Sequence, residues 1–551
     1  MNALLPLPRQ GALDGRAVPL STDATLTMSG HPGLLTRVLP PLDALARRAR
    51  GIGLAACAPG MPGTSSLGSA STAHLGLRFE VVDESRLDGL PAALGQAPCA
   101  AGAFDERYEL EVDGDGAGAT VRAASAAGAF RGATVLLQAL DASDGIRVPS
   151  GRIRDAPLLA WRGLSLDVAR HFVDVDDVKR VIDLLAWHRL NVLHLHLTDT
   201  QAWRLESERW PLLTATGAPF YSRDEWRELV RFADERFVTI VPELDMPGHV
   251  GAALAAYPEL AEGAEFAHPR LGYLDPHVPA TVRFASDVLD EVTELSTSAF
   301  VHLGGDEAFG MPEPAYARFV AEVVEHVHGI PRRVIGWQEA TRADALSSTR
   351  LAGPDLVQLW ISEKDAFDAE AVKARTSAEY HALVDEAAKT AALAPQDGPR
   401  AVAAGIPLIL SPSSPLYLNR GYAEPSADPA QTDAGVRLGF PDYAPENTAA
   451  LADWDPFAWV AENVPGAAIA GVEAAIWGET VESFDDLALL LLPRLAVVAE
   501  RAWSPAVSPW ESVAARLRCN DEVWARMGFG AWYRSVEVMQ GRRRPTVWDH
   551  S

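Results

Sequence analysis

The chain has 551 residues, which is too long for one ordinary hydrophobic core, so two or three domains are expected. Its 48 basic and 74 acidic residues give a formal net charge of −26, and such a field repels phosphate backbones and anionic lipids. We therefore predict that the protein binds neither nucleic acid nor a membrane surface.

The cysteines and the first residues bear on the cellular compartment. Cys57, Cys99 and Cys519 are too few for a disulfide framework and lie in no CxxC pattern. The opening MNALLPLPRQGALDGR lacks the basic and apolar regions of a signal peptide, and no apolar run would span a bilayer. We expect a cytoplasmic protein, or a secreted one if a leader has been removed, with no cofactor and no metal.

Residues 1–155 alternate short strand-like and helix-like stretches, which indicates a small α+β domain. The expected helices are 40–50 and 127–140, and the expected strands are 75–82, 108–112 and 119–123. The segment 59–73 is rich in Gly, Ser and Pro and is interpreted as an exposed loop. The segment 148–157, with two prolines and a glycine, is interpreted as a connector.

From Trp161 onward a strand-like run, a loop and an amphipathic helix recur. Helical patterns include 175–188, 222–235 and 278–295, and the expected strands are 163–168, 191–197, 237–244, 299–303, 333–337, 356–360, 406–410 and 467–477. This repetition predicts a (β/α)8 TIM barrel over residues 156–505. A doubly wound open sheet is the alternative, disfavoured because no glycine-rich phosphate-binding turn follows the first strand.

Two further regions stand apart from the repeating pattern. The interval 361–405 is longer than one βα unit needs, and we expect an insertion with a helix at 376–390 and a turn at 394–399. Residues 506–551 are expected to form a C-terminal helical extension that ends in surface charge at Arg542, Arg543 and Arg544.

The most informative motif is VHLGGDEAF at 301–309, in which two glycines precede the adjacent carboxylates Asp306 and Glu307. Neighbouring side chains of a strand point to opposite faces, so the two acids are expected to have different roles. Gly304 and Gly305 would let a sugar ring approach the backbone closely. Taken alone, the acidic pair could also be a solvated strand end.

Polar and aromatic residues also occur where the other predicted strands end, which in a barrel is the active face. Aromatic rings stack on the C–H faces of a pyranose, and charged groups bind its hydroxyls. Besides Asp306 and Glu307, the candidate residues are Arg170, Asp199, His249, Trp337, Trp360, Tyr417, Asn419, Trp477 and Glu479.

Eight ordered segments carry a family resemblance: RGLSLDVARHF, NVLHLHLTDTQAWR, PELDMPGH, VHLGGDEAF, IGWQE, YLNR, AAIWGE and PRLAVVAERAW. Over about 153–503 the chain resembles family 20 glycoside hydrolases, the β-N-acetylhexosaminidases, and residues 1–155 resemble the small domain that precedes their barrel. The resemblance implies an exo-acting, retaining enzyme that removes terminal β-linked N-acetylglucosamine or N-acetylgalactosamine through the substrate's own acetamido group.

The resemblance also implies a role for each candidate. Glu307 would be the general acid and base, Asp306 would orient the acetamido nitrogen, and Tyr417 would bind the acetamido oxygen. The remaining candidates would support Glu307 (Asp199 and His249), wall the pocket (Trp337, Trp360 and Trp477) or hold ring hydroxyls (Arg170, Asn419 and Glu479). Thr200 and Ala202 depart from the family pattern, which often has an acid and a glycine there, but Asp199 is retained.

Three other interpretations remain open. His194 and His196 form an HxH pattern near Asp199 that suits a metal-dependent hydrolase, although both share one strand face and could be hydrogen-bonded inside the barrel. A sugar-binding protein without activity would keep the same fold. A retaining glycosidase with its own carboxylate nucleophile is the third. The natural glycan, the preference between the two sugars and the oligomeric state are not indicated.

Overall fold

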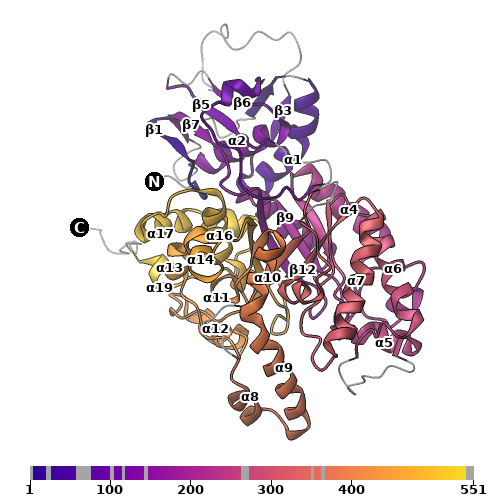
Figure 1. The fold of residues 1–551 in the computed structure, drawn as a ribbon. Helices are drawn as coiled ribbons and strands as arrows, with labels where there is room; N and C mark the ends of the chain where they lie inside the picture. Colours follow the sequence, from indigo (N-terminus) through magenta and orange to yellow (C-terminus); the bar gives the residue numbers. More distant parts are fainter. Residues whose placement is uncertain are drawn as a thin grey trace.

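The computed structural model describes residues 4–19, 26–30, 32–56, 76–99, 105–114, 118–141, 147–261, 272–348, 353–361 and 367–540. A small α+β domain stands on one end of a closed barrel of parallel strands (Figure 1). The predicted loop at 59–73 and the arginines at 542–544 lie outside the described residues.

The small domain contains a seven-stranded mixed sheet with the strand order β1-β7-β5-β6-β4-β2-β3. The first four strands in this order pair antiparallel and the remaining pairs are parallel. The strands are β1 (Gln10–Pro19), β2 (Leu26–Ser29), β3 (Leu54–Ala56), β4 (Gly76–Val81), β5 (Tyr108–Val112), β6 (Ala119–Ala123) and β7 (Arg147–Asp155). The α+β class predicted for this region is confirmed.

Two helices, α1 (Pro32–Arg50) and α2 (Ala126–Ala139), cover the sheet on the side that faces the barrel (Figure 1). Helix α2 begins at a Ser125 cap and is buried at every position from Ala127 to Ala139. It is buried all round because it packs on the sheet and also contacts the barrel. Arg131 donates to the Phe237 carbonyl at 2.9 Å, and Gln138 donates to that of Trp187 at 2.7 Å.

The connector predicted at 148–157 is wrong, because most of this segment is strand β7, which lies between β1 and β5 in the sheet. Pro149 is tolerated because it pairs with Ala17 beside a register irregularity, where a strand can do without one N–H donor. Gly151 is required because a Cβ there would lie 2.3 Å from the Ala12 carbonyl oxygen. Strands β1, β2 and β3 were also not predicted.

The barrel closes in the order β10-β11-β12-β13-β14-β15-β8-β9, and every described pairing is parallel. The predicted (β/α)8 barrel is therefore confirmed, with all eight strands near their expected positions. They are β8 (Trp161–Asp167), β9 (Val192–His196), β10 (Thr239–Glu243), β11 (Phe300–His302), β12 (Arg333–Trp337), β13 (Leu356–Leu359), β14 (Leu408–Leu410) and β15 (Ile469–Ile476).

Helices alternate with these strands on the outside of the barrel (Figure 1). The first are α3 (Val175–Trp187), α4 (Arg223–Glu235), α5 (Gly251–Ala256), α6 (Pro279–Glu294) and α7 (Glu313–Gly329), followed by a short 3₁₀ helix at Gln338–Ala343. Later units carry α11 (Ser413–Leu416), α12 (Thr432–Leu438), α13 (Thr448–Asp453), α14 (Pro456–Asn463), α15 (Phe484–Leu491) and α16 (Arg494–Trp503). The helices predicted at 175–188, 222–235 and 278–295 are α3, α4 and α6.

The insertion between β13 and β14 holds α8 (Ala369–Arg375), α9 (His381–Leu393) and α10 (Asp397–Ala404), of which α8 and α9 project from the barrel (Figure 1). The predicted helix therefore begins at His381 rather than at 376. The turn predicted at 394–399 is wrong, because a 3₁₀ turn there leads directly into α10. Pro399 is accommodated in the first turn of α10, where a missing N–H costs no helical hydrogen bond.

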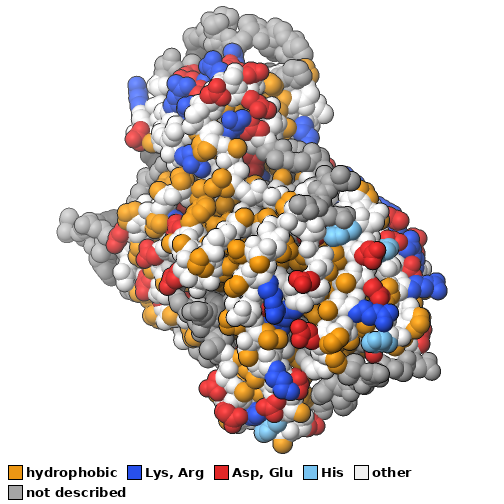
Figure 2. Space-filling view, viewed as in Figure 1, with side chains coloured by type: hydrophobic (Ala, Val, Ile, Leu, Met, Phe, Trp, Pro, Cys, Tyr) orange, Lys and Arg blue, Asp and Glu red, His pale blue; other side chains and the backbone are white. Residues whose placement is uncertain are grey.

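After the barrel the chain forms α17 (Trp510–Cys519), α18 (Asp521–Arg526) and α19 (Val536–Met539), and α18 contacts α1 of the small domain. No helix in the described part of the chain is long and apolar enough to cross a membrane. Figure 2 shows acidic and basic side chains interspersed on the visible face of the small domain. The domain boundaries, the compartment and the lack of nucleic-acid or membrane binding remain predictions.

Candidate active site at the C-terminal end of the barrel

The loop after β11 carries the two adjacent acids in an unusual backbone conformation. Strand β11 ends at His302, and Gly304, Gly305 and Glu307 have φ values of +68°, +98° and +48°. Gly304 is required because a Cβ there would lie 1.7 Å from Oδ1 of Asp245. The expectation that strand alternation separates the acids is therefore wrong, and the left-handed turn determines their directions instead.

Asp306 and Glu307 have different surroundings. Glu307 has 38% of its side chain exposed and Asp306 only 14%. Oδ1 of Asp306 is buried and has no hydrogen-bond partner among the described residues. Burial and the neighbouring Asp245 raise the pKa of Asp306 well above its usual value. The loop thus presents one accessible carboxyl group and one buried carboxyl group with an unused acceptor oxygen.

Asp199 and His249 form an ion pair beneath these acids. His249 Nδ1 lies 3.0 Å from Asp199 Oδ2, and His249 Nε2 lies 3.5 Å from Glu307 Oε2 and 3.9 Å from Asp306 Oδ2. Burial opposes ionisation of both members of the pair. The charges of His249 and Arg170 nevertheless hold the pKa of Asp199 well below its usual value, and Asp199 and nearby carboxylates raise that of His249 well above 6.5.

Arg170, at the end of β8, joins this group to the aromatic wall. Its guanidinium lies 2.7 Å from Asp199 Oδ2 and 3.3 Å from Asp167 Oδ2, and 5.3 Å from the centre of the Trp477 ring. Glu479 is exposed near the end of β15, and its charge acts on the pKa of Arg170. These contacts bring together the arginine, the acids and the imidazole predicted from the sequence.

Aromatic rings line the next part of the rim. Trp477 lies 5.9 Å from Trp337 and 5.8 Å from Tyr417, measured between ring centres. Tyr417 stacks on Trp360 at 6.3 Å with an interplanar angle of 7°. Trp337 is almost completely buried and donates from Nε1 to Glu243 at 2.8 Å. The three predicted tryptophans and the tyrosine therefore form one continuous wall.

Asn419 follows the same wall two residues after Tyr417. Its side chain is fully buried, and neither its amide nitrogen nor its amide oxygen has a hydrogen-bond partner among the described residues. Unsatisfied buried amides are rare in folded proteins, so an unused donor and acceptor at a site rim indicate a place for a ligand. Its predicted role in binding a ring hydroxyl remains a prediction.

His194 and His196 point into the barrel from one face of β9. His194 Nδ1 lies 2.9 Å from Glu473 Oε1, whereas His196 Nδ1 lies 2.6 Å from Glu243 Oε2 and its Nε2 lies 3.1 Å from Asp199 Oδ2. The prediction that both rings can be hydrogen-bonded inside the barrel is confirmed. Most of their nitrogen atoms are thus occupied by carboxylates of the protein.

Two acids at the rim were missed as site residues, although both lie in quoted motifs. Asp245 ends PELD, accepts a hydrogen bond from the Gly305 N–H at 2.9 Å and has its pKa raised to about 6, mainly by burial. Glu339 ends IGWQE, lies 3.2 Å from the indole nitrogen of Trp360 and has its pKa raised to about 8, again mainly by burial. Both residues could have been found from the sequence, because Asp245 closely follows the third predicted barrel strand and Glu339 the fifth.

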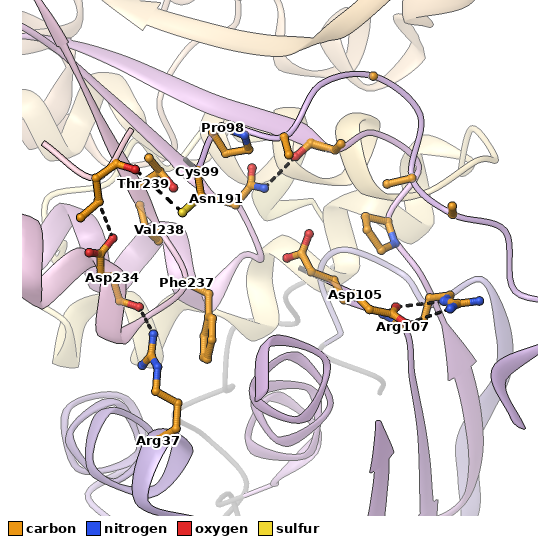
Figure 3. A pocket seen from close by; sticks show the side chains of 18 of the residues that line it. Arg37, Pro98, Cys99, Asp105, Arg107, Asn191, Asp234, Phe237, Val238 and Thr239 are labelled. Carbon is orange, nitrogen blue, oxygen red and sulfur yellow. Dashed lines mark hydrogen bonds and ion pairs between the residues drawn. The ribbon is translucent and has the colours of Figure 1, made fainter. Parts of the chain in front are cut away.

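A cavity of about 650 Å³ lies at the opposite end of the barrel, beneath the small domain (Figure 3). Its polar side chains bond within the protein. Arg37 donates to the Glu235 carbonyl at 2.9 Å, Asn191 donates to that of Ala160 at 2.7 Å, and Arg107 pairs with Asp105 at 2.8 Å. These labelled lining residues therefore offer no group of convergent unpaired acids comparable with the rim.

Comparisons with known proteins agree with this arrangement. Residues 159–506 match the model for the catalytic domain of glycosyl hydrolase family 20, and residues 1–156 match the model for domain 2 of that family. The chain belongs to glycoside hydrolase family 20. As a member of this β-hexosaminidase family it is a glycoside hydrolase, and the family predicted from the sequence is confirmed.

Relatives of this family 20 chain are similar over most of its length. A β-N-acetylhexosaminidase of Cellulomonas fimi is 35% identical over 454 residues, which are 79% of this chain and 82% of the relative. The solved family 20 β-N-acetylhexosaminidase of Streptomyces coelicolor A3(2) is 31% identical, with a TM-score of 0.74 over 97% of this chain and 98% of that one. The Streptomyces plicatus enzyme in complex with Thio-NAglucal is 30% identical, with a TM-score of 0.75 over 97% of both chains.

Proposed function

We propose that this family 20 protein is an exo-acting β-N-acetylhexosaminidase that removes terminal non-reducing β-linked N-acetylglucosamine or N-acetylgalactosamine with retention of configuration. One observation carries the proposal. The partly exposed Glu307 and the buried Asp306 both approach Nε2 of His249, at 3.5 and 3.9 Å, so a proton donor lies beside an unused acceptor. Enzymes of this family, as a class, replace the carboxylate nucleophile by the substrate's acetamido group.

In the first step Glu307 donates its proton to the glycosidic oxygen while the acetamido oxygen attacks C1 and the C1–O bond breaks. Asp306 accepts a hydrogen bond from the acetamido N–H and so directs the acetamido oxygen toward C1. The hydroxyl of Tyr417 donates to that oxygen. The products of this step are the free aglycone and a cyclic oxazolinium-type intermediate held in the pocket.

In the second step Glu307, now a carboxylate, takes a proton from water while the water oxygen attacks C1 and opens the ring. Two successive displacements at C1 give retention. The wall formed by Trp337, Trp360 and Trp477 stacks on the sugar and its acetyl group, and it excludes water from the intermediate. Arg170, Asn419 and Glu479 bind the ring hydroxyls, and the ion pair of Asp199 and His249 fixes the charge next to Glu307.

The buried carboxyls Asp245 and Asp306 share a proton in this scheme. The pKa of both carboxyls is raised, that of Asp245 to about 6 and that of Asp306 further, because two adjacent buried carboxylates cannot both ionise cheaply. The bound acetamido N–H needs an acceptor, and it favours the state in which Asp245 carries the proton and Asp306 is ionised. The positive charge that develops on the acetamido group then favours ionised Asp306. Substrate charge and protein charge are thus matched at the same point.

The test is release of p-nitrophenol from the β-N-acetylglucosaminide, the β-N-acetylgalactosaminide and the β-glucoside, each with and without EDTA. We expect turnover of the two acetamido sugars alone and no effect of EDTA, and proton NMR should show the β-anomer of the sugar as the first product. Equal rates on the β-glucoside would contradict the role of the acetamido group. Loss of activity with EDTA would favour a metal-dependent hydrolase, and silence on all three a binding protein.

A further inference from the structure

Six ionisable side chains form a continuous column through the barrel interior up to the catalytic loop. We call them the axial column, and in order they are Glu473, His194, Glu243, His196, Asp199 and His249. Carboxylates and imidazoles alternate along it, and its first four members are no more than 1% exposed. They come from β15, β9 and β10 and from the loops that follow β9 and β10.

The lower half of the column lies well below the rim. Oε1 of Glu473 lies 2.9 Å from Nδ1 of His194, and Nε2 of His194 lies 3.1 Å from Oε2 of Glu243. The same Glu243 oxygen lies 2.6 Å from Nδ1 of His196. His194 therefore contacts a carboxylate at each of its ring nitrogens, and His196 contacts Glu243 at its Nδ1.

The upper half reaches the catalytic acid. Nε2 of His196 lies 3.1 Å from Oδ2 of Asp199, which lies 3.0 Å from Nδ1 of His249. Nε2 of His249 then lies 3.5 Å from Oε2 of Glu307. No link from Glu473 to Glu307 is longer than this last distance, so charge at the lower end is connected to Glu307 through direct contacts alone.

The lower end is built to hold a fixed negative charge. Trp161 Nε1 and Gln358 Nε2 donate to Glu473 at 2.8 and 3.0 Å. Gly163 leaves the space for this carboxylate, since a Cβ at that position would lie 2.3 Å from Oε2 of Glu473. Burial would lower the pKa of His194, but Glu243 and Glu473 outweigh it and raise that pKa to about 9. His194 is therefore protonated at neutral pH.

His302 also contacts Glu243 but does not belong to the column. Its Nδ1 lies 3.0 Å from the Gly304 backbone nitrogen and 3.1 Å from Oε1 of Glu243. Burial is the main cause that lowers the pKa of His302, which keeps it neutral. The two stacked rings therefore differ in charge, because His194 is protonated and His302 is neutral.

We propose that His194 and Glu473 are positioning residues, which set the charge of the pair Asp199 and His249 and thereby the pH range over which Glu307 works. The inference rests on the proposed function of Glu307. Neither residue touches the substrate in this scheme, because both lie inside the barrel below Glu243 and His196. They act through the alternation of charge along the axial column.

Other charged groups face the column and enter the same balance. His302 stacks on His194 with ring centres 4.6 Å apart, and Arg170 lies 3.3 Å from Nε2 of His196. Among the acids near the upper half, Asp245 and Asp306 act on His249, and Glu479 acts on Asp199. All of these groups remain in the variants proposed below, so each single variant changes one charge only.

The sign of the response separates this role from simple packing. A buried cation favours loss of a proton from every nearby group, so its removal should move the pH limbs of kcat/KM upward. Removal of a buried anion should move them downward. Damage to the barrel core, in contrast, would lower kcat/KM at every pH without shifting the profile in opposite directions.

The experiment measures kcat/KM from pH 4 to 9 for wild type, His194→Asn, Glu473→Gln and the double variant, on an N-acetylglucosaminide with a poor leaving group. His194→Asn keeps a donor toward Glu473, and Glu473→Gln keeps the shape of the side chain. We expect shifts of a few tenths to about one pH unit, upward for His194→Asn and downward for Glu473→Gln, with partial cancellation in the double variant.

Ser411→Ala is the matched control, because its hydroxyl lies in the same layer and donates to the Glu473 backbone carbonyl without carrying charge. Its profile should coincide with that of wild type. Unshifted profiles, or shifts of the same sign, for folded His194→Asn and Glu473→Gln would overturn the proposal, and Glu473→Gln decides alone if the other does not fold. An inactive wild type would instead refute the proposed function.

Discussion

Two groups of buried charge stand at opposite ends of the same barrel, and they are completed in different ways. Beneath the small domain, Glu106 accepts hydrogen bonds from Arg131 and Arg162 at 2.8 Å, and Asp155 accepts from Arg189 at 2.9 Å. Both carboxylates are occupied by the protein, and the atoms without hydrogen-bond partners in this group include arginine N–H groups.

The C-terminal rim shows the opposite pattern. There the atoms without hydrogen-bond partners among the described residues include the acceptors Oδ1 of Asp306 and Oε1 of Glu339. The arginines outweigh burial and lower the pKa of Glu106, whereas burial dominates and raises that of Asp306 and, at the junction, that of Asp155. A saturated carboxylate stabilises the fold, and an unsaturated one is available to a substrate. Substitutions at the two ends of the barrel should therefore have different effects.

The largest effect is expected at the rim. Glu307→Gln should lower kcat/KM by roughly 10²–10⁴-fold on substrates with poor leaving groups, but far less on activated aryl glycosides, which need no general acid. The free energy of unfolding should hardly change, because Glu307 is partly exposed. Initial rates on a series of aryl N-acetylglucosaminides would measure this. Asp306→Asn is the companion variant and should impair all of them, since it weakens the internal nucleophile.

An equal loss for Glu307→Gln across all leaving groups would contradict its role as general acid. It would also weaken the comparison, because the accessible acid would then act as a structural group.

At the junction the expected effect is on stability. Glu106→Gln leaves Arg131 and Arg162 without their carboxylate and should lower the free energy of unfolding by about 3–5 kcal/mol. The kcat/KM of the folded protein at 25 °C should stay within about twofold of wild type. Denaturant unfolding together with initial rates measures both quantities.

The control for this variant is Asp224→Asn, which removes an exposed ion pair with Arg227 and should change stability little. A large loss of activity for folded Glu106→Gln would show that the junction is coupled to the rim.

The smallest effect is a pH dependence at the junction. His188 is fully buried, accepts from the Trp524 indole at 2.9 Å and lies 3.1 Å from the Leu5 carbonyl, and burial lowers its pKa to about 4. The unfolded chain therefore binds a proton below about pH 6.5 that the folded protein does not. This contribution to stability is complete above pH 6.5 and should fall by about 3 kcal/mol as the pH decreases to 4.

The measurement is the free energy of unfolding at several pH values for wild type and His188→Gln. The variant should be less stable at pH 7 and should show a smaller slope between pH 6.5 and 4. Identical slopes would mean that the pKa of His188 is the same in the folded and the unfolded protein.

The barrel could be predicted from the sequence because each strand is a short apolar run between recognisable helices. The site residues could be predicted because polar residues follow those runs. It missed β7, since Pro149 and Gly151 look like breaks until β1 and β5 are placed on either side of the strand. The direction of Asp306 and Glu307 was also beyond reach. It depends on a left-handed turn that is fixed by Asp245, a residue from the neighbouring strand end.

In the candidate site, contacts between residues that follow neighbouring strands could be expected from the sequence. Asp199 meets His249 because β9 and β10 are adjacent in the barrel. The raised pKa values of Asp245 and Asp306 could not be anticipated, because they depend on how deeply both side chains are buried. The roles of all these residues in the reaction remain predictions.

Helix α2 has a consequence for anyone who wishes to prepare the barrel by itself. Because both of its sides are buried, the small domain and the barrel share a continuous apolar core across the junction. Removal of residues 1–155 would expose the barrel surface around Trp187 and Phe237 to solvent. The small domain by itself would expose the apolar side chains of α2. The useful unit for immobilisation, fusion or directed evolution is therefore the small domain together with the barrel. Attachments should be made away from the junction of these two domains.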